Sequence, residues 1–179
     1  IEPLNSKLMA STILEIDGQR GFTLSEVLIT IVIVGILSSI ALPNFLNQIR
    51  RTRQNEAATT ITQLQSTIIS YADENGTYPT SWKDLNEVAA IMTPSGEKKA
   101  EELIDNFNEV TLASSSCQQK TDENCYTYKV EKKGISLFEL RATPKSLDNA
   151  YAVTACLDLI SGYSDFRKEP SDTAIACEG

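Results

Sequence analysis

The sequence predicts an α+β protein. One long N-terminal α-helix packs on an antiparallel β-sheet of about three to four strands, and disulfides hold the C-terminal region. Three patterns support this fold class: an unbroken apolar run covers residues 22–42, apolar residues then recur every three or four positions through residue 71, and from residue 126 the period is two. These periods are typical of a membrane-length helix, an amphipathic helix and half-buried strands.

The apolar run has the length of a membrane-spanning helix. Its 21 residues at about 1.5 Å per residue give roughly 31 Å, which matches the thickness of a hydrocarbon core. Gly35 and Pro43 are the positions where this helix is predicted to kink, because proline removes a backbone donor and clashes with the preceding turn. We therefore assign residues 22–43 to a hydrophobic transmembrane or assembly helix.

The same helix is predicted to continue as an amphipathic segment over residues 44–76. Its apolar positions lie mostly one turn apart: Leu46, Ile49, Ala57, Ile61, Leu64, Ile68 and Tyr71. A stripe of this kind packs against a globular domain. The pair Asn75-Gly76, followed by Pro79, indicates the end of the helix, because glycine favours the left-handed C-cap and proline cannot continue the helix.

Residues 77–179 are predicted to form the globular headgroup. Helical turns are expected over residues 82–91, after a Ser81 cap, and over residues 97–107. Alternating apolar and polar residues then predict strands over 126–131 and 135–141, joined by a turn at Lys133-Gly134, with further strands over 150–156 and 110–113. The resulting sheet is antiparallel and packs on the amphipathic helix.

All four cysteines lie in the second half of the chain. An even number of cysteines in a domain outside the cytosol indicates two disulfides, for which three pairings are possible. We favour Cys117–Cys125 and Cys156–Cys177, since sequential pairing closes short loops. The second bridge would hold the polar C-terminal segment to the last strand of the sheet. A metal site is less favoured, because the chain has no Cys-x-x-Cys pair and no histidine.

The composition argues against catalysis and nucleic-acid binding. The formal charge is -8, whereas binding to phosphates requires clustered basic residues. The one dense basic cluster, Arg50, Arg51 and Arg53, follows the apolar run and is expected to anchor at lipid headgroups. Without histidine, the commonest general base is missing, so we expect neither an enzyme nor a cofactor. Four aspartates could in principle bind calcium, but a solvated acidic surface is favoured: Asp148, Asp158, Asp165 and Asp172.

Glu26 is the informative residue of the N-terminal segment. It lies just inside the apolar run, where an ionised side chain is costly and indicates a function that requires a partner. No basic residue lies among residues 22–44. A cut between Gly21 and Phe22 would create a positive α-amino group one helical turn from Glu26, and this amine is the predicted partner.

The run Gly-Phe-Thr-Leu-Ser-Glu before an apolar helix resembles the prepilin N-terminus that is shared by type IV pilins and the pseudopilins of type II secretion. The resemblance covers roughly residues 20–80. It implies a leader over residues 1–21, cleavage after Gly21 by a prepilin peptidase, and N-methylation of the new first residue, Phe22. It also implies that Glu26 guides each subunit into a growing filament.

This resemblance predicts a structural subunit of a type IV pilus, polymerised through its N-terminal helix. Two alternatives stay open: a type II secretion pseudopilin, and a secreted or periplasmic binding domain with a signal peptide cut after Ser39-Ile40-Ala41. The expected partners are copies of the chain, other pilins, the prepilin peptidase, the pilus assembly machinery and membrane lipid. The cysteines place the globular domain outside the cytoplasm. The precursor is then a single-pass inner-membrane protein, and the assembled subunit is extracellular.

Overall fold

The fold was analysed in a computed structural model, which describes residues 21–97, 106–119, 123–146, 149–169 and 177. The chain divides into two compact units, residues 1–43 and residues 44–179. Each unit is described by itself. The predicted boundaries of the leader (1–21), apolar helix (22–43), amphipathic helix (44–76) and headgroup (77–179) remain predictions about processing and function.

Helix α1, Leu24–Asn75, is continuous across the apolar and amphipathic segments. Pro43 lies inside it, and a kink at Pro43 or Gly35 stays a prediction. The helix ends where the sequence indicates: Gly76 has a φ of 64°, and its N–H donates to the carbonyl of Ala72 at 2.9 Å. A left-handed residue at this place is what glycine allows without steric cost.

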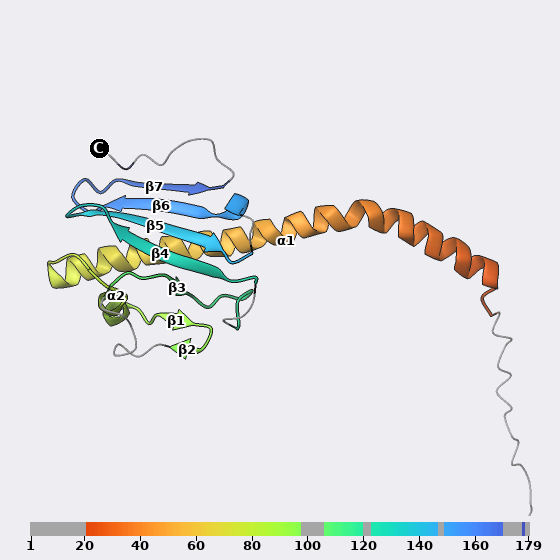
Figure 1. Ribbon diagram of the computed structural model, residues 1–179, viewed down its shortest axis with the longest axis horizontal. Helices are drawn as coiled ribbons and strands as arrows, with labels where there is room; N and C mark the ends of the chain where they lie inside the picture. Colours follow the sequence, from red (N-terminus) through yellow and green to blue (C-terminus); the bar gives the residue numbers. More distant parts are fainter. Residues whose placement is uncertain (1–20, 98–105, 120–122, 147–148, 170–176, 178–179) are drawn as a thin grey trace, which may run out of the picture. The chain divides into compact units, whose positions relative to one another are not determined.

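The main sheet has five antiparallel strands in the order β3-β4-β5-β6-β7 (Figure 1). Their bounds are Val110–Thr111 for β3, Tyr126–Lys132 for β4, Leu137–Pro144 for β5, Val153–Asp158 for β6 and Ser164–Lys168 for β7. The predicted α+β fold class is confirmed, with one strand more than expected. Strand β7 was missed because it is a polar edge strand with no buried side chain, so it lacks the apolar alternation that marks the others.

The segment between α1 and the sheet is less helical than predicted. Helix α2 covers Trp82–Val88 and begins with a capping box, in which Ser81 and Asp84 each bond the other's backbone N–H. It stops early because Ala89 is extended. Short strands β1, Met92–Thr93, and β2, Gly96–Glu97, pair with each other. The predicted helix over residues 97–107 therefore starts in a strand, and residues 98–105 lie outside the described residues.

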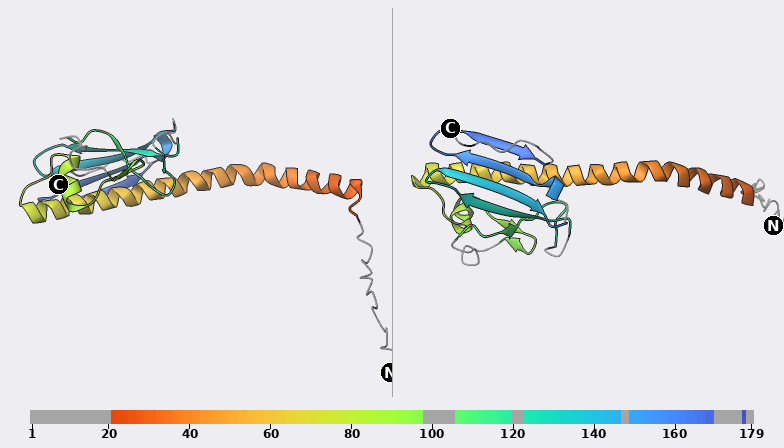
Figure 2. Two further views of the ribbon diagram at one scale, coloured as in Figure 1. Left: turned by 90° about the horizontal axis from the view of Figure 1, so that it is seen from below. Right: turned by 45° about the horizontal axis from the view of Figure 1, so that its top comes forward.

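The core of the second unit lies between the sheet and one face of α1, which runs along the sheet in both views of Figure 2. The helix contributes Ala57, Ala58, Ile61, Leu64 and Ile68, and the strands contribute Tyr128, Val130, Phe138, Leu140, Ala142, Val153 and Ala155. Of the predicted stripe, Leu46 is exposed and Ile49 and Tyr71 are half-buried. The packed face of α1 therefore begins later than the apolar pattern.

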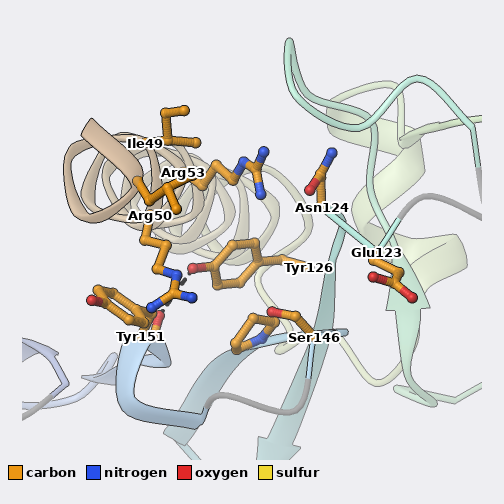
Figure 3. A pocket seen from close by; sticks show the side chains of 10 residues that line it. Ile49, Arg50, Arg53, Glu123, Asn124, Tyr126, Ser146 and Tyr151 are labelled. Carbon is orange, nitrogen blue, oxygen red and sulfur yellow. Dashed lines mark hydrogen bonds between the residues drawn. The ribbon is translucent and has the colours of Figure 1, made fainter. Parts of the chain in front are cut away.

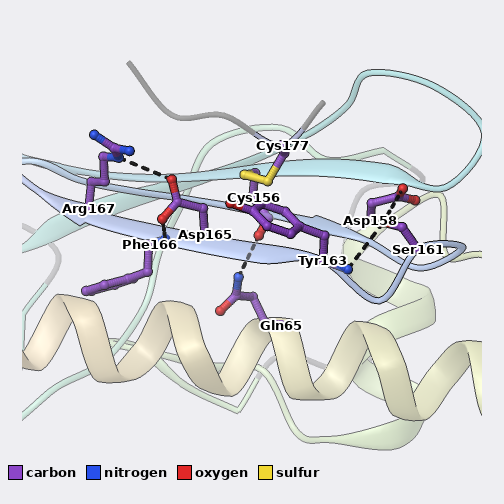
Figure 4. The surroundings of a disulfide bond; sticks show 9 residues. All are labelled: Gln65, Cys156, Asp158, Ser161, Tyr163, Asp165, Phe166, Arg167 and Cys177. Atoms are coloured by element: carbon purple, nitrogen blue, oxygen red, sulfur yellow. Dashed lines mark hydrogen bonds and ion pairs between the residues drawn. A yellow bond between two sulfur atoms is a disulfide. The ribbon is translucent and has the colours of Figure 1, made fainter. Parts of the chain in front are cut away.

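Two glutamines on α1 bond backbone carbonyls in or next to the strands of the sheet. The buried Gln54 side-chain amide donates to the carbonyls of Ala152 at 3.2 Å and Glu169 at 2.6 Å. Further along α1, the Gln65 side-chain amide donates to the carbonyl of Cys156 at 3.0 Å (Figure 4). A buried amide that is satisfied in this way fixes the position of a strand along a helix. Hydrophobic periodicity carries no signal for these contacts.

The cysteines are joined as Cys117–Cys125 and Cys156–Cys177, with Cα–Cα distances of 4.8 Å and 6.0 Å. The second bridge starts from β6, as Figure 4 shows, and not from the last strand. The bridge joins Cys177 to the strand predicted over residues 150–156, as expected, but this strand is not the last one, because β7 follows it and occupies the edge of the sheet.

Alkaline pH is expected to destabilise the second unit through Tyr128. Burial raises the pKa of this phenol to about 12, from 10.0, with a smaller raising effect of Glu56 and an opposing hydrogen bond with Thr60. A raised folded pKa means that the native state keeps its proton longer, so stability falls as pH rises from 10 to 12, by roughly 2 to 3 kcal/mol. Denaturant unfolding of Tyr128→Phe should show a shallower fall over this range. An equal slope in both proteins would contradict this origin.

Candidate processing and assembly site

The candidate site is the segment from Gly21 to Glu26, where extended chain becomes helix. Thr23 is the N-cap of α1: its Oγ1 accepts from the Glu26 N–H at 3.3 Å, and its carbonyl accepts from the Val27 N–H at 3.2 Å. An N-cap hydroxyl satisfies one of the backbone donors that a helix leaves open at its start. Residue 24 is therefore the first helical residue.

The carboxylate of Glu26 bonds back to Thr23. Its Oε2 accepts from the Thr23 N–H at 2.8 Å and from the Thr23 hydroxyl at 2.7 Å. Together with the bond from the Glu26 N–H, this is a reciprocal capping box, for which Thr-x-x-Glu is the sequence signal. In the uncut chain Glu26 thus has uncharged partners. The spacing of Thr23 and Glu26 predicts these bonds, although neither partner of Glu26 is a cation.

Gly21 and Phe22 precede the helix and are fully accessible. Phe22 is 79% exposed, and a Cβ added at Gly21 would meet no atom within 4 Å. The fold therefore tolerates a side chain at position 21. If glycine is required there, the requirement is set by an enzyme that recognises this segment and not by packing. The roles of Gly21 and Phe22 in cleavage, and the pairing of the Phe22 amine with Glu26, remain predictions.

The apolar surface that follows Glu26 is uncovered. None of the side chains over residues 24–43 is buried, and the segment contains a window of mean hydropathy 2.3, long and apolar enough to cross a membrane. A soluble monomer rarely exposes a continuous apolar patch larger than a few hundred Å². Lipid or other protein chains must therefore cover this helix.

Two of the four candidate aspartates, Asp158 and Asp165, make bonds within the fold. Asp158 accepts from the hydroxyls of Ser136 at 2.6 Å and Ser161 at 2.7 Å, and these bonds lower its pKa to about 2. Asp165 binds the Arg167 guanidinium at 3.2 Å. Asp148 and Asp172 lie outside the described residues. Within the part of the chain that the structure describes, no three His, Cys, Asp or Glu residues converge on a metal position.

The N-terminal segment carries a prepilin-type motif. Residues 16–42 match the family described as the prokaryotic N-terminal methylation motif. This segment is similar to the N-termini of type IV pilins and pseudopilins, as the sequence resemblance indicated.

Both branches of the family occur among the relatives. The chain is 34% identical over 77 residues to the type II secretion system core protein G of Escherichia coli (strain K12), covering 43% of this chain and 53% of that protein. The equivalent protein of Vibrio cholerae is 41% identical over 75 residues, covering 42% and 51%. The type IV major pilin protein PilA of Myxococcus xanthus is 42% identical over 59 residues, covering 33% and 27%. No solved structure matches the chain.

The family model covers residues 16–42 alone. The chain spans about half the length of the type II secretion proteins that it matches. Similarity to several core G proteins favours the pseudopilin alternative at least as much as the type IV pilus subunit that the sequence first suggested.

Proposed function

We propose that the chain is a structural subunit of a filament assembled from prepilins, of the pseudopilin kind that serves type II secretion. Its apolar helix first anchors the stored precursor in the membrane and then forms the core of a helical polymer. The globular unit lies outside the cytoplasm, where its two disulfides persist. The chain is not an enzyme in this proposal.

One observation carries the proposal: a single carboxylate, Glu26, stands at the start of a helical segment, residues 24–43, in which no side chain is buried. A membrane anchor alone needs no carboxylate, and in lipid a charge is costly. A polymer of such helices uses both features. Neighbouring helices cover the apolar surface, and Glu26 meets the Phe22 amine of its own chain or of a neighbour, which favours the correct axial register.

The proposed contact is heterologous, because the N-terminus of one chain meets a different surface of the next. Contacts of this kind do not close on themselves unless the rotation between subunits closes a ring. They otherwise generate an open helical polymer, which agrees with a subunit role and does not require a dedicated dimer surface.

A type IV pilus subunit is the second candidate. The match to the Myxococcus xanthus pilin, two disulfides and a long connection before β4 favour it. Adhesion, motility, DNA uptake and secretion are properties of the whole assembly and differ between the two candidates.

Fractionation of the host separates the candidates. Cells should be sheared, and the chain quantified in the extracellular filaments and in the envelope. We expect the chain in short envelope-bound polymers, with loss of protein secretion when its gene is deleted. Recovery of the chain as the bulk of long sheared filaments, with secretion intact, would favour the pilus candidate. A processed chain that stays monomeric in the membrane would contradict both.

A further inference from the structure

A cavity of about 580 Å³ lies in the second unit, and its walls come from three parts of the fold. Helix α1 supplies one wall, the adjoining ends of β4 and β5 supply the second, and the 3-10 helix η2, Asn149–Tyr151, supplies the third. The lining residues are Leu46, Ile49, Arg50, Arg53, Glu123, Asn124, Tyr126, Pro144, Ser146 and Tyr151. Nothing in the filament proposal uses this cavity.

Two guanidinium groups converge on it in an otherwise acidic protein. In Figure 3 the Arg53 side chain reaches from α1 toward Asn124, and the Arg50 side chain reaches toward Tyr151. Arg50 lies over the Tyr151 ring, with Cζ 5.9 Å from the ring centre. Within the described ranges Arg53 makes no ion pair. Among the lining residues that the structure describes, Glu123 is the one carboxylate beside the two arginines.

The cavity is preorganised by contacts that the fold makes elsewhere. The Tyr126 hydroxyl donates to the Tyr151 carbonyl at 3.0 Å, which holds the η2 wall against β4. The Lys145 N–H donates to the Cys125 carbonyl at 2.9 Å, and Cys125 is itself tied by its disulfide to Cys117. A ligand that enters this cavity therefore meets fixed walls, which lowers the entropic cost of binding.

The position of the cavity along α1 indicates the ligand. Phe45 and Leu46 are 61% and 46% exposed and extend the apolar surface past Pro43. Arg50 and Arg53 then follow Leu46 by four and seven residues, which is about 6 and 10 Å along a helix. The polar headgroup layer of a bilayer begins at the edge of the hydrocarbon core and is roughly 5 to 8 Å thick. Counted from Leu46, Arg50 thus lies within the thickness of one headgroup layer and Arg53 lies just beyond it.

We propose that this cavity binds the phosphate of an anionic phospholipid headgroup, with Arg50 and Arg53 as its ligands. A guanidinium binds a phosphate through two parallel N–H donors. Asn124 and Ser146 line the same space and supply neutral donors for the headgroup, while Leu46 and Ile49 contact the start of an acyl chain. The cavity would hold the precursor at a fixed depth before assembly.

This inference rests on the proposed function only in placing α1 in a membrane. It also differs from simple attraction between arginines and a negative surface. Such attraction would treat Arg50, Arg51 and Arg53 alike, but Arg51 does not line the cavity. Arg51 therefore provides a matched control with the same charge on the same turn of the helix.

The test uses the full chain in neutral detergent micelles, with phosphatidylglycerol added and bound lipid counted by native mass spectrometry. At about 0.5 M salt the screening length is roughly 4 Å, which suppresses long-range attraction. We expect one retained phosphatidylglycerol per chain and much weaker retention of phosphatidylcholine. Arg50→Gln and Arg53→Gln should each weaken binding by at least about tenfold, whereas Arg51→Gln should change it less than about twofold. Glu123→Gln should strengthen it.

Equal losses in the three arginine variants would overturn the proposal, as would equal retention of phosphatidylcholine. Inorganic phosphate is the third ligand tested. If millimolar phosphate saturates the site and the site does not prefer the lipid, the cavity binds free anions, and the lipid assignment is overturned. Circular dichroism of each variant verifies that it is folded. Lipid binding is measured on unassembled chains. Absence of lipid binding would therefore not contradict the filament proposal, and absence of filaments would not prevent the measurement of lipid binding.

Discussion

Glu26→Ala is expected to abolish polymer formation while membrane insertion remains intact. Insertion should become easier, because the variant removes a charge from the edge of the apolar run. Assembly should fail, because the Phe22 amine would then be left without its carboxylate in an apolar medium. Losing one partner of a charge pair in such a medium costs about 3 to 5 kcal/mol, which corresponds to a loss of at least about 100-fold in the association constant.

Two further variants separate the charge of Glu26 from its capping bonds. Glutamine also serves at this position of a capping box, so Glu26→Gln keeps the helix start and loses only the charge. We expect it to fail in assembly like Glu26→Ala. Thr23→Val removes the hydroxyl that Glu26 contacts but keeps the carboxylate, and we expect partial assembly. Electron microscopy and sedimentation measure polymer yield. Normal polymer from Glu26→Gln would show that capping is the essential property of Glu26.

Gly21→Leu is expected to block cleavage and leave the folded headgroup unchanged. The structure has open space around position 21, so the larger side chain should not disturb either unit. The proposed peptidase, in contrast, recognises the residue before the cut. We therefore expect the processed fraction to fall by at least about tenfold, because enzymes discriminate against one misfitting aliphatic group by about this factor. Electrophoretic mobility after co-expression with the peptidase measures this fraction.

Gly35→Ala is the matched control for Gly21→Leu. A Cβ at Gly35 also meets no atom within 4 Å, and residue 35 lies inside the helix, away from the predicted cut. Its processing should be normal. Unchanged cleavage of Gly21→Leu, or loss of cleavage in both variants, would count against Gly21 as the recognised residue.

Periodicity predicted the elements that bury a regular apolar face. The C-terminal part of α1, with Ala57, Ile61 and Leu64, and the hairpin of β4 and β5 follow directly from spacings of three to four and of two. Strand β7 could not be found in this way. Apart from Phe166 its side chains are polar, and none is buried. The position of β7 depends on backbone pairing with β6, which side-chain hydrophobicity does not report.

The sequence predicted only part of the candidate site. The cost of a charge in lipid identifies Glu26, and the glycine and phenylalanine before it give the predicted cut. The capping partner Thr23 was detectable in principle, because Thr-x-x-Glu is a local signal. The cavity around Arg50 and Arg53 was not, since its walls come from residues some 70 to 100 positions further along the chain. Only the folded sheet brings Asn124 and Tyr151 to α1.

The most direct test of this account is the mass of the mature N-terminus. The chain should be expressed with a prepilin peptidase, purified from the membrane, and its N-terminal peptide sequenced by mass spectrometry. We expect the first residue to be Phe22 and its amine to carry one methyl group. A mature chain that begins at Leu42 would establish an ordinary signal peptide, and a chain that keeps residues 1–21 in assembled polymer would contradict the role of the new amine as the partner of Glu26.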